Sequence, residues 1–236
     1  MTTIYLGVSA PDAATKRALN GARVGVFLSR VSYRPWRQDT FLDSARWGLD
    51  SGAFSGLVDL DEYIVDVRHA RGRVNPPADL FALDVIGDWR ASLRNYDKLR
   101  ALGLDVIPTW HVGTPEHVLL TLAREYPKLA IGGVVSSRLR GGRLIGLLTQ
   151  AFARVWPKRI HGFGILGHSA LFAVPFHTVD GTGWSRARRF GEWAGRHYKQ
   201  KMYCDAGVID LTPQVRYFED LQDRLKARWA KELTEL

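Results

Sequence analysis

The stretch LFALDVIGDWRASLRNYDKLRALGLDVIPTWHVGTPEHVLLTLAREYPKLAIGGVV, residues Leu80–Val135, decides the fold. It alternates short apolar runs with segments in which apolar side chains recur every three or four residues. Short continuous apolar runs are typical of parallel strands buried on both faces, whereas the three-to-four spacing indicates amphipathic helices. This order of elements predicts a parallel sheet whose strands are joined by right-handed crossovers.

The same alternation continues toward both ends of the chain. Strands are predicted at Ile4–Val8, Arg23–Ser29, Trp47–Asp50, Leu80–Val85, Asp105–Trp110, Ala130–Val135, Arg159–Leu166, Pro175–Asp180 and Lys201–Cys204. Helices are predicted at 11–20, 59–72, 90–102, 141–155, 185–199 and about 212–235, with another opened by Thr114-Pro115. About eight such units in 236 residues match one α/β domain, a compact (β/α)8 TIM-like barrel spanning residues 1–236. A doubly wound open sheet is the alternative, but no Gly-x-Gly-x-x-Gly follows the first strand.

The composition excludes several classes of protein. At 46% hydrophobic and 24% charged residues the chain is an ordinary globular protein, neither disordered nor a coiled coil. The single cysteine, Cys204, excludes an internal disulfide framework and a multi-cysteine zinc site. No signal peptide and no apolar run of about 18 residues is present, so we expect a soluble, cytoplasmic protein without a membrane partner.

The charge favours a polyanionic partner. The 33 Lys and Arg residues outnumber the 24 Asp and Glu residues and give a net charge of +9. The arginines cluster in two groups, Arg138, Arg140 and Arg143, and Arg186, Arg188, Arg189 and Arg196. Clustering of this kind indicates nucleic-acid contacts, and a basic surface kept for solubility is the alternative.

Three strands end on or run into a carboxylate. Asp50, Asp84 and Asp180 each stand at the end of a predicted strand, and His111 follows another. In a (β/α)8 barrel such residues face one shared mouth, where like charges raise one another's pKa. An Asp after a strand is also a common helix N-cap, and a lone histidine is often only a structural hydrogen-bonding residue. The Asp and His spacing matches no metal motif, so no metal is predicted.

Paired carboxylates at one site suit displacement at an anomeric carbon. One carboxylate attacks while another protonates the leaving group, and a covalent intermediate retains the configuration. The basic surface suggests that the glycosyl donor is a polyphosphate chain.

The motif DSGAFS at Asp50–Ser55 resembles the Asp-Ser-Gly-Gly-Phe-Gln signature of the guanine transglycosylases, TIM-barrel enzymes that exchange guanine in nucleic acid for a 7-deazaguanine base. FALD at Phe81–Asp84 is similar to the segment that carries the family's base-recognition aspartate, and IGG at Ile131–Gly133 to its glycine pair. Asp180 falls where the family has its nucleophile. The chain has Ala53 and Ser55 in place of a glycine and a glutamine, and it has no cysteine-rich zinc subdomain. In this it is most similar to the short bacterial and phage DNA transglycosylases.

The resemblance implies a role for each site residue. Asp180 is expected to attack C1′ of the target nucleotide, and Asp50 to transfer the proton between the leaving and the incoming base. The residues expected to bind the base are Asp84, Ser51, Gly52, Phe54, His111, Gly132, Gly133 and Gly164. His177 is a further candidate for lining the pocket, and Phe54, Trp110 and Trp184 are candidates for stacking on the base. The two arginine groups, with Arg186, Arg188 and Arg189 in the second, are expected to hold flanking phosphates, and no cofactor is required.

The implied substrates are duplex DNA, with one nucleotide flipped out of the helix, and a free 7-deazaguanine base. The implied setting is the cytoplasm of a bacterium or of a phage-infected host, where such DNA modification protects against restriction. Three alternatives remain: the same chemistry on tRNA, a non-catalytic barrel that binds nucleic acid, and a hydrolase of a phosphorylated sugar. The sequence leaves open whether the chain forms a homodimer or needs a helper protein.

Overall fold

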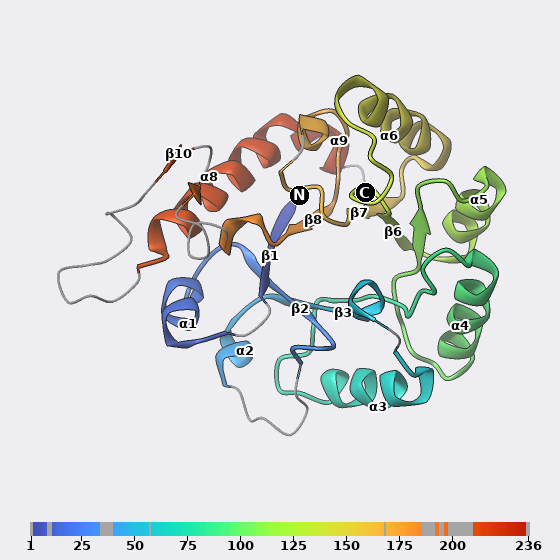
Figure 1. The fold of residues 1–236 in the computed structure, drawn as a ribbon, viewed down its shortest axis with the longest axis horizontal. Coiled ribbons are helices and arrows are strands. Elements are labelled where there is room, and N and C mark those ends of the chain that lie inside the picture. The colour runs from blue at the N-terminus through green and yellow to red at the C-terminus, as the bar shows by residue number, and fades with distance from the viewer. Residues whose placement is uncertain are drawn as a thin grey trace.

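Eight parallel strands form a single barrel. The computed structural model describes residues 2–8, 11–33, 40–56, 58–167, 169–185, 192–193, 196–197 and 210–234. The sheet has the order β4-β3-β2-β1-β8-β7-β6-β5 (Figure 1). The strands are β1 Thr3–Val8, β2 Gly25–Ser29, β3 Trp47–Asp50, β4 Asp79–Leu80, β5 Thr109–His111, β6 Lys128–Gly132, β7 Arg159–Gly162 and β8 Thr178–Gly181.

One parallel bridge, between Phe81 and Ile107, joins the two ends of this sheet. The N–H of Ala82 donates to the Ile107 carbonyl at 2.8 Å, and the N–H of Ile107 donates to the Leu80 carbonyl at 2.7 Å. The predicted α/β fold class, a (β/α)8 barrel, is therefore confirmed.

The helices surround the ring of strands (Figure 1). They are α1 Ala13–Leu19, α2 Phe41–Ser44, α3 Leu60–Arg71, α4 Trp89–Ala101, α5 Glu116–Glu125, α6 Gly141–Val155, α8 Thr212–Arg228 and α9 Ala230–Thr234, with 3-10 turns η1 Ala53–Ser55, η2 Ser169–Phe172 and η3 Gly183–Ser185. Helix α6 has the predicted bounds. None of the helices in the described part of the chain is long and apolar enough to cross a membrane.

Two predictions near the C-terminus need correction. The helix predicted at 185–199 is wrong where the structure describes it, because β9 Glu192–Trp193 and β10 Arg196–His197 pair antiparallel. Gly191 and Gly195 in this segment disfavour a helix. The helix predicted at 212–235 is interrupted at Trp229, which separates α8 from α9. The predicted strand Lys201–Cys204 lies outside the described residues.

The barrel interior is filled by polar side chains at the amino ends of the strands and by aromatic rings in the part next to them. At the amino ends of the strands, Asp79 accepts a 2.8 Å hydrogen bond from the Tyr5 hydroxyl and pairs with Lys128. Rings of Phe27, Phe81, Phe163 and His161 pack together in the next part of the interior. This filled interior leaves the carboxyl ends of the strands as the place for a site.

Candidate active site

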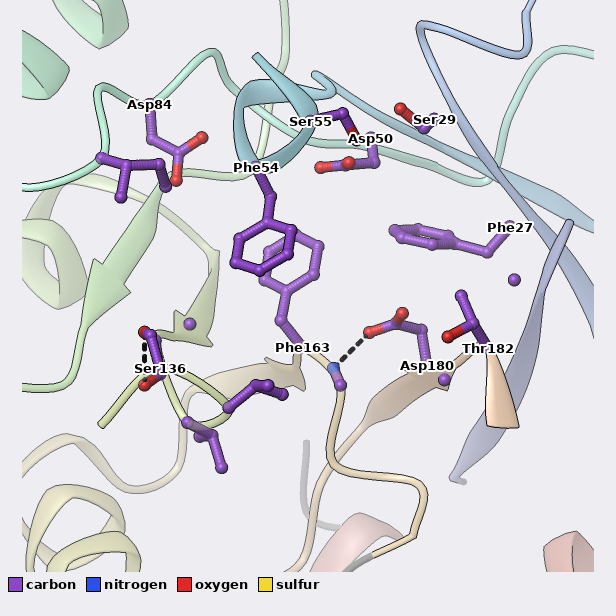
Figure 2. Close-up of a pocket in the computed structure, with 18 of the residues that line it drawn as sticks. Phe27, Ser29, Asp50, Phe54, Ser55, Asp84, Ser136, Phe163, Asp180 and Thr182 are labelled. Carbon is purple, nitrogen blue, oxygen red and sulfur yellow. Dashed lines mark hydrogen bonds between the residues drawn. The ribbon is translucent and has the colours of Figure 1, made fainter. Parts of the chain in front are cut away.

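A cavity of about 420 Å³ lies at the carboxyl ends of the strands, within the range of small-molecule sites. Asp50, Asp84, Asp180 and His111 all line it. In Figure 2, Asp50 and Asp84 come from one side of the cavity and Asp180 from the other. The prediction that these strand ends meet at one mouth is confirmed.

Asp50 is the last residue of β3, and its environment favours the protonated acid. Its Oδ2 accepts a hydrogen bond from the N–H of Gly52 at 3.1 Å. Gly52 has φ +79°, a left-handed conformation that favours glycine in this turn after β3. Burial, followed by the charges of Asp84 and Asp180, raises the pKa of Asp50 to about 7. A carboxyl group with such a pKa both gives and takes a proton near neutral pH.

Asp84 is held by two side chains. The Ser51 hydroxyl donates to its Oδ1 at 3.3 Å, and His111 Nε2 is hydrogen-bonded to its Oδ2. Gly132 makes room for the histidine, since a Cβ at this position would lie 3.0 Å from His111 Cε1. Gly132, one of the glycine pair predicted to bind the base, therefore gives room to the His111 ring.

Asp180, in β8, is nearly buried, with 8% of its surface exposed. Its Oδ1 accepts a hydrogen bond from the N–H of Gly164 at 2.8 Å (Figure 2). His161 Nε2 lies 3.4 Å from the same oxygen. The carboxylate is thus held through one oxygen.

Aromatic side chains form much of the cavity wall. Phe54, on η1, lines the cavity with 76% of its surface exposed, and Phe27 and Phe163 line it from within the barrel. The other predicted stacking candidates are wrong. Trp184 is buried and donates its indole N–H to the Gly7 carbonyl at 2.9 Å, and Trp110 is a buried core residue.

Three residues predicted to bind the base contact the site carboxylates in the structure. Ser51 is fully buried and holds Asp84, while Gly52 holds Asp50. Gly164 lines the cavity but directs its N–H at Asp180. His177 directly precedes β8, at the opposite end of the barrel from the cavity, so its prediction as a lining residue is wrong.

Some lining residues were not predicted from the sequence. Phe27 lies within the uniformly apolar run of β2, where nothing marks one residue as facing a cavity. Val135 and Ser136 line the cavity from the loop after β6. Arg138, Arg140 and Arg143 follow in the same loop and the first turn of α6, and all three are exposed. The predicted phosphate contacts Arg186, Arg188 and Arg189 lie outside the described residues.

Comparison with known proteins bears on the fold. The sequence matches no protein-family model and no curated protein. The structure resembles a mutant tryptophan synthase alpha-subunit from Pyrococcus furiosus, with a TM-score of 0.51 and 10% identity over 96% of this chain and 97% of that one. It also aligns with 2,3-dimethylmalate lyase, of the PEP mutase/isocitrate lyase superfamily, at a TM-score of 0.48 and 11% identity over 95% and 93% of the two chains. At such identity the likeness is one of fold alone.

The arrangement suits acid–base and nucleophilic chemistry on a planar ligand. It combines a carboxyl group that titrates near neutrality, a second carboxylate held by one oxygen, and a third paired with histidine. Within the described part of the chain, no group of three or more His, Cys, Asp or Glu side chains is arranged to hold a metal ion.

Proposed function

We propose that this protein is a base-exchanging glycosyltransferase that replaces guanine in DNA with a 7-deazaguanine base. The observation that carries the proposal is the meeting of Asp50, Asp84 and Asp180 around one cavity, with the pKa of Asp50 raised to about 7. Double displacement at an anomeric carbon needs a nucleophilic carboxylate and a second group that moves a proton. The motifs DSGAFS and FALD resemble those of the guanine transglycosylases, and this resemblance suggests that the exchanged bases are guanine and a 7-deazaguanine.

In the first step, Asp180 attacks C1′ of the flipped nucleotide. The new bond joins a carboxylate oxygen to C1′, the bond from C1′ to the base breaks, and the Asp50 proton goes to the leaving guanine. Gly164 occupies Oδ1 of Asp180, which leaves Oδ2 as the attacking oxygen. A covalent aspartyl–nucleotide intermediate results.

In the second step the incoming 7-deazaguanine displaces the carboxylate. Its ring nitrogen bonds to C1′, the ester bond breaks, and its N–H proton returns to Asp50. Two inversions restore the original configuration at C1′. Because Asp50 gives a proton in one step and takes one in the next, a pKa near the working pH serves both directions.

Asp84 and Phe54 are the residues that recognise the base in this proposal. Asp84 faces the cavity as a hydrogen-bond acceptor, and His111 fixes its orientation. Phe54 offers an exposed ring on which a flipped base stacks. Arg140 and Arg143, exposed beside the cavity loop, are suited to hold phosphates flanking the flipped nucleotide.

Exchange of labelled guanine tests the proposal when run in parallel on duplex DNA and on bulk tRNA. We expect label to enter DNA, and Asp180→Asn to abolish both exchange and the covalent adduct while DNA affinity is retained. Asp97→Asn, at an exposed aspartate on α4, is the matched control and should exchange normally. Label entering tRNA alone would change the polymer but keep the mechanism. Undiminished exchange in Asp180→Asn would rule out the assigned nucleophile, and no label in either polymer would favour a non-catalytic barrel.

A further inference from the structure

A second buried group lies directly against the carboxylate of Asp180. His161, in β7, has no exposed surface. Its ring packs against three aromatic rings, with centroids at 4.5 Å from Phe81, 4.6 Å from Phe163 and 5.6 Å from Phe27. These contacts leave the imidazole little freedom to rotate, so the directions of its two nitrogens are fixed.

The two ring nitrogens of His161 have different surroundings. Nδ1 is hydrogen-bonded to the hydroxyl of Thr178 at 2.8 Å. Nε2 has no hydrogen-bond partner among the described residues and lies 3.4 Å from Asp180 Oδ1. A buried polar atom without a partner is costly, and hydrogen bonds of an active site are often long before substrate binds.

The identity of Asp180 decides which nitrogen carries the proton. A carboxylate only accepts hydrogen bonds, and an unprotonated Nε2 would direct its lone pair at that negative charge. The Thr178 hydroxyl either gives or takes a hydrogen, so it is free to donate to an unprotonated Nδ1. The favourable tautomer is the one with the proton on Nε2.

We propose that His161 is a positioning residue that donates its Nε2–H to Oδ1 of Asp180 and so directs Oδ2 at the anomeric carbon. The inference rests on the proposed function, in which Asp180 is the nucleophile. With Gly164, His161 then supplies two donors to one oxygen. That oxygen becomes the ester carbonyl in the covalent intermediate and carries charge again when the carboxylate leaves.

The surroundings of His161 suit a neutral donor. Burial among the aromatic rings lowers its pKa, although Asp180 opposes the shift. A neutral imidazole orients the carboxylate without transferring a proton to it.

Substitutions at His161 test the role through the rate of adduct formation at saturating DNA. His161→Leu removes the donor and is expected to slow adduct formation by about 10- to 100-fold, the usual effect of losing a hydrogen bond to a charged group. His161→Gln retains an N–H near the Nε2 position and should recover part of the rate. DNA affinity should be unchanged in both variants. His177→Leu, at the other end of the barrel, is the control for removing a part-buried histidine and should form adduct at the wild-type rate.

Nitrogen NMR of the histidine side chains gives a readout that needs neither folding of a variant nor activity. We expect His161 to carry its proton on Nε2 at neutral pH. A proton on Nδ1 would overturn the inference, as would wild-type adduct formation in a folded His161→Leu. If the wild-type protein forms no adduct with DNA or RNA, the proposed function fails. The NMR result then decides separately whether His161 donates to Asp180.

Discussion

The raised pKa of Asp50 makes the stability of the folded protein depend on pH. A carboxylate near two others is disfavoured by burial and by their charges, and both effects favour the neutral acid. The folded protein therefore binds a proton at Asp50 more tightly than the unfolded chain does. Between the unfolded pKa near 4 and the folded pKa of about 7, Asp50 is ionised in the unfolded chain but protonated in the folded protein. The free energy of unfolding therefore falls as the pH rises through this range.

Asp50→Asn should therefore stabilise the protein in a pH-dependent way. The amide keeps an oxygen that accepts from Gly52 but cannot ionise. We expect its stability advantage over the wild type to grow by about 2–3 kcal/mol between about pH 5 and about pH 8. Urea unfolding at each pH measures this. Asp61→Asn, at an exposed carboxylate, is the control for loss of one charge. An advantage that is the same at all pH values would show that Asp50 is not held as a neutral acid.

At the scale of elements, Gly132 at the end of β6 makes room for the side chain at the end of β5. A Cβ on Gly132 would lie 2.9 Å from Thr109 Cγ2 and 3.0 Å from the His111 ring. The neighbouring strand is backbone-bonded to β6, so it has little room to move away. The glycine therefore lets His111 reach Asp84 across the strand ends.

Gly132→Ala should destabilise the protein by about 1–3 kcal/mol, because the added methyl group overpacks this contact. It should also displace His111 and broaden or shift its NMR signals. Gly146→Ala in α6 is a matched control, since nothing lies within 4 Å of its added Cβ. That substitution should stabilise the protein by up to about 1 kcal/mol through helix propensity. Equal urea midpoints for the two variants would contradict the packing argument.

The sequence predicted the elements better than their bounds. Trp47–Asp50 and α6 match because an apolar run or helical stripe begins and ends at clear breaks. The strand predicted at Leu80–Val85 is only Asp79–Leu80. Phe81 then forms one isolated bridge, and Ala82 and Leu83 are buried outside the strand. Hydrophobicity reports burial, and it does not distinguish a strand from a buried loop.

The sequence predicted which carboxylates meet at the site but not the side chains that hold them. Strand topology brings Asp50, Asp84 and Asp180 together whatever their rotamers, so their meeting follows from the fold. Ser51 and His111 were predicted as base-binding residues, but their hydrogen bonds to Asp84 were not, and His161 was not predicted. These contacts depend on side-chain directions and close packing across strands, which one sequence does not encode in any local pattern. The predicted stacking role of Trp184 failed for the same reason, because its large apolar ring also suits the core.

At the scale of the whole molecule, the two ends of the barrel have different tasks. At the amino ends of the strands, the ion pair of Asp79 and Lys128 fills the barrel interior. At the carboxyl ends of the strands lie the cavity and its carboxylates. Negative charge at the cavity would repel a polyanion. The chain as a whole carries a net charge of +9, and the exposed Arg140 and Arg143 follow the segment that lines the cavity. Under the proposed function these two arginines are the described residues expected to attract DNA to the mouth.

Arg140→Ala/Arg143→Ala should weaken DNA binding uniformly across sequences. Each lost phosphate contact removes about 0.9 from the slope of log affinity against log salt concentration, so the double variant should reduce the slope by roughly 2. Arg124→Ala/Arg154→Ala removes the same charge from the last turns of α5 and α6, away from the loop that follows β6, and should change the slope little. Fluorescence anisotropy over a salt series measures both. Equal slopes for the two double variants would mean that net charge alone attracts DNA, without contacts at the mouth.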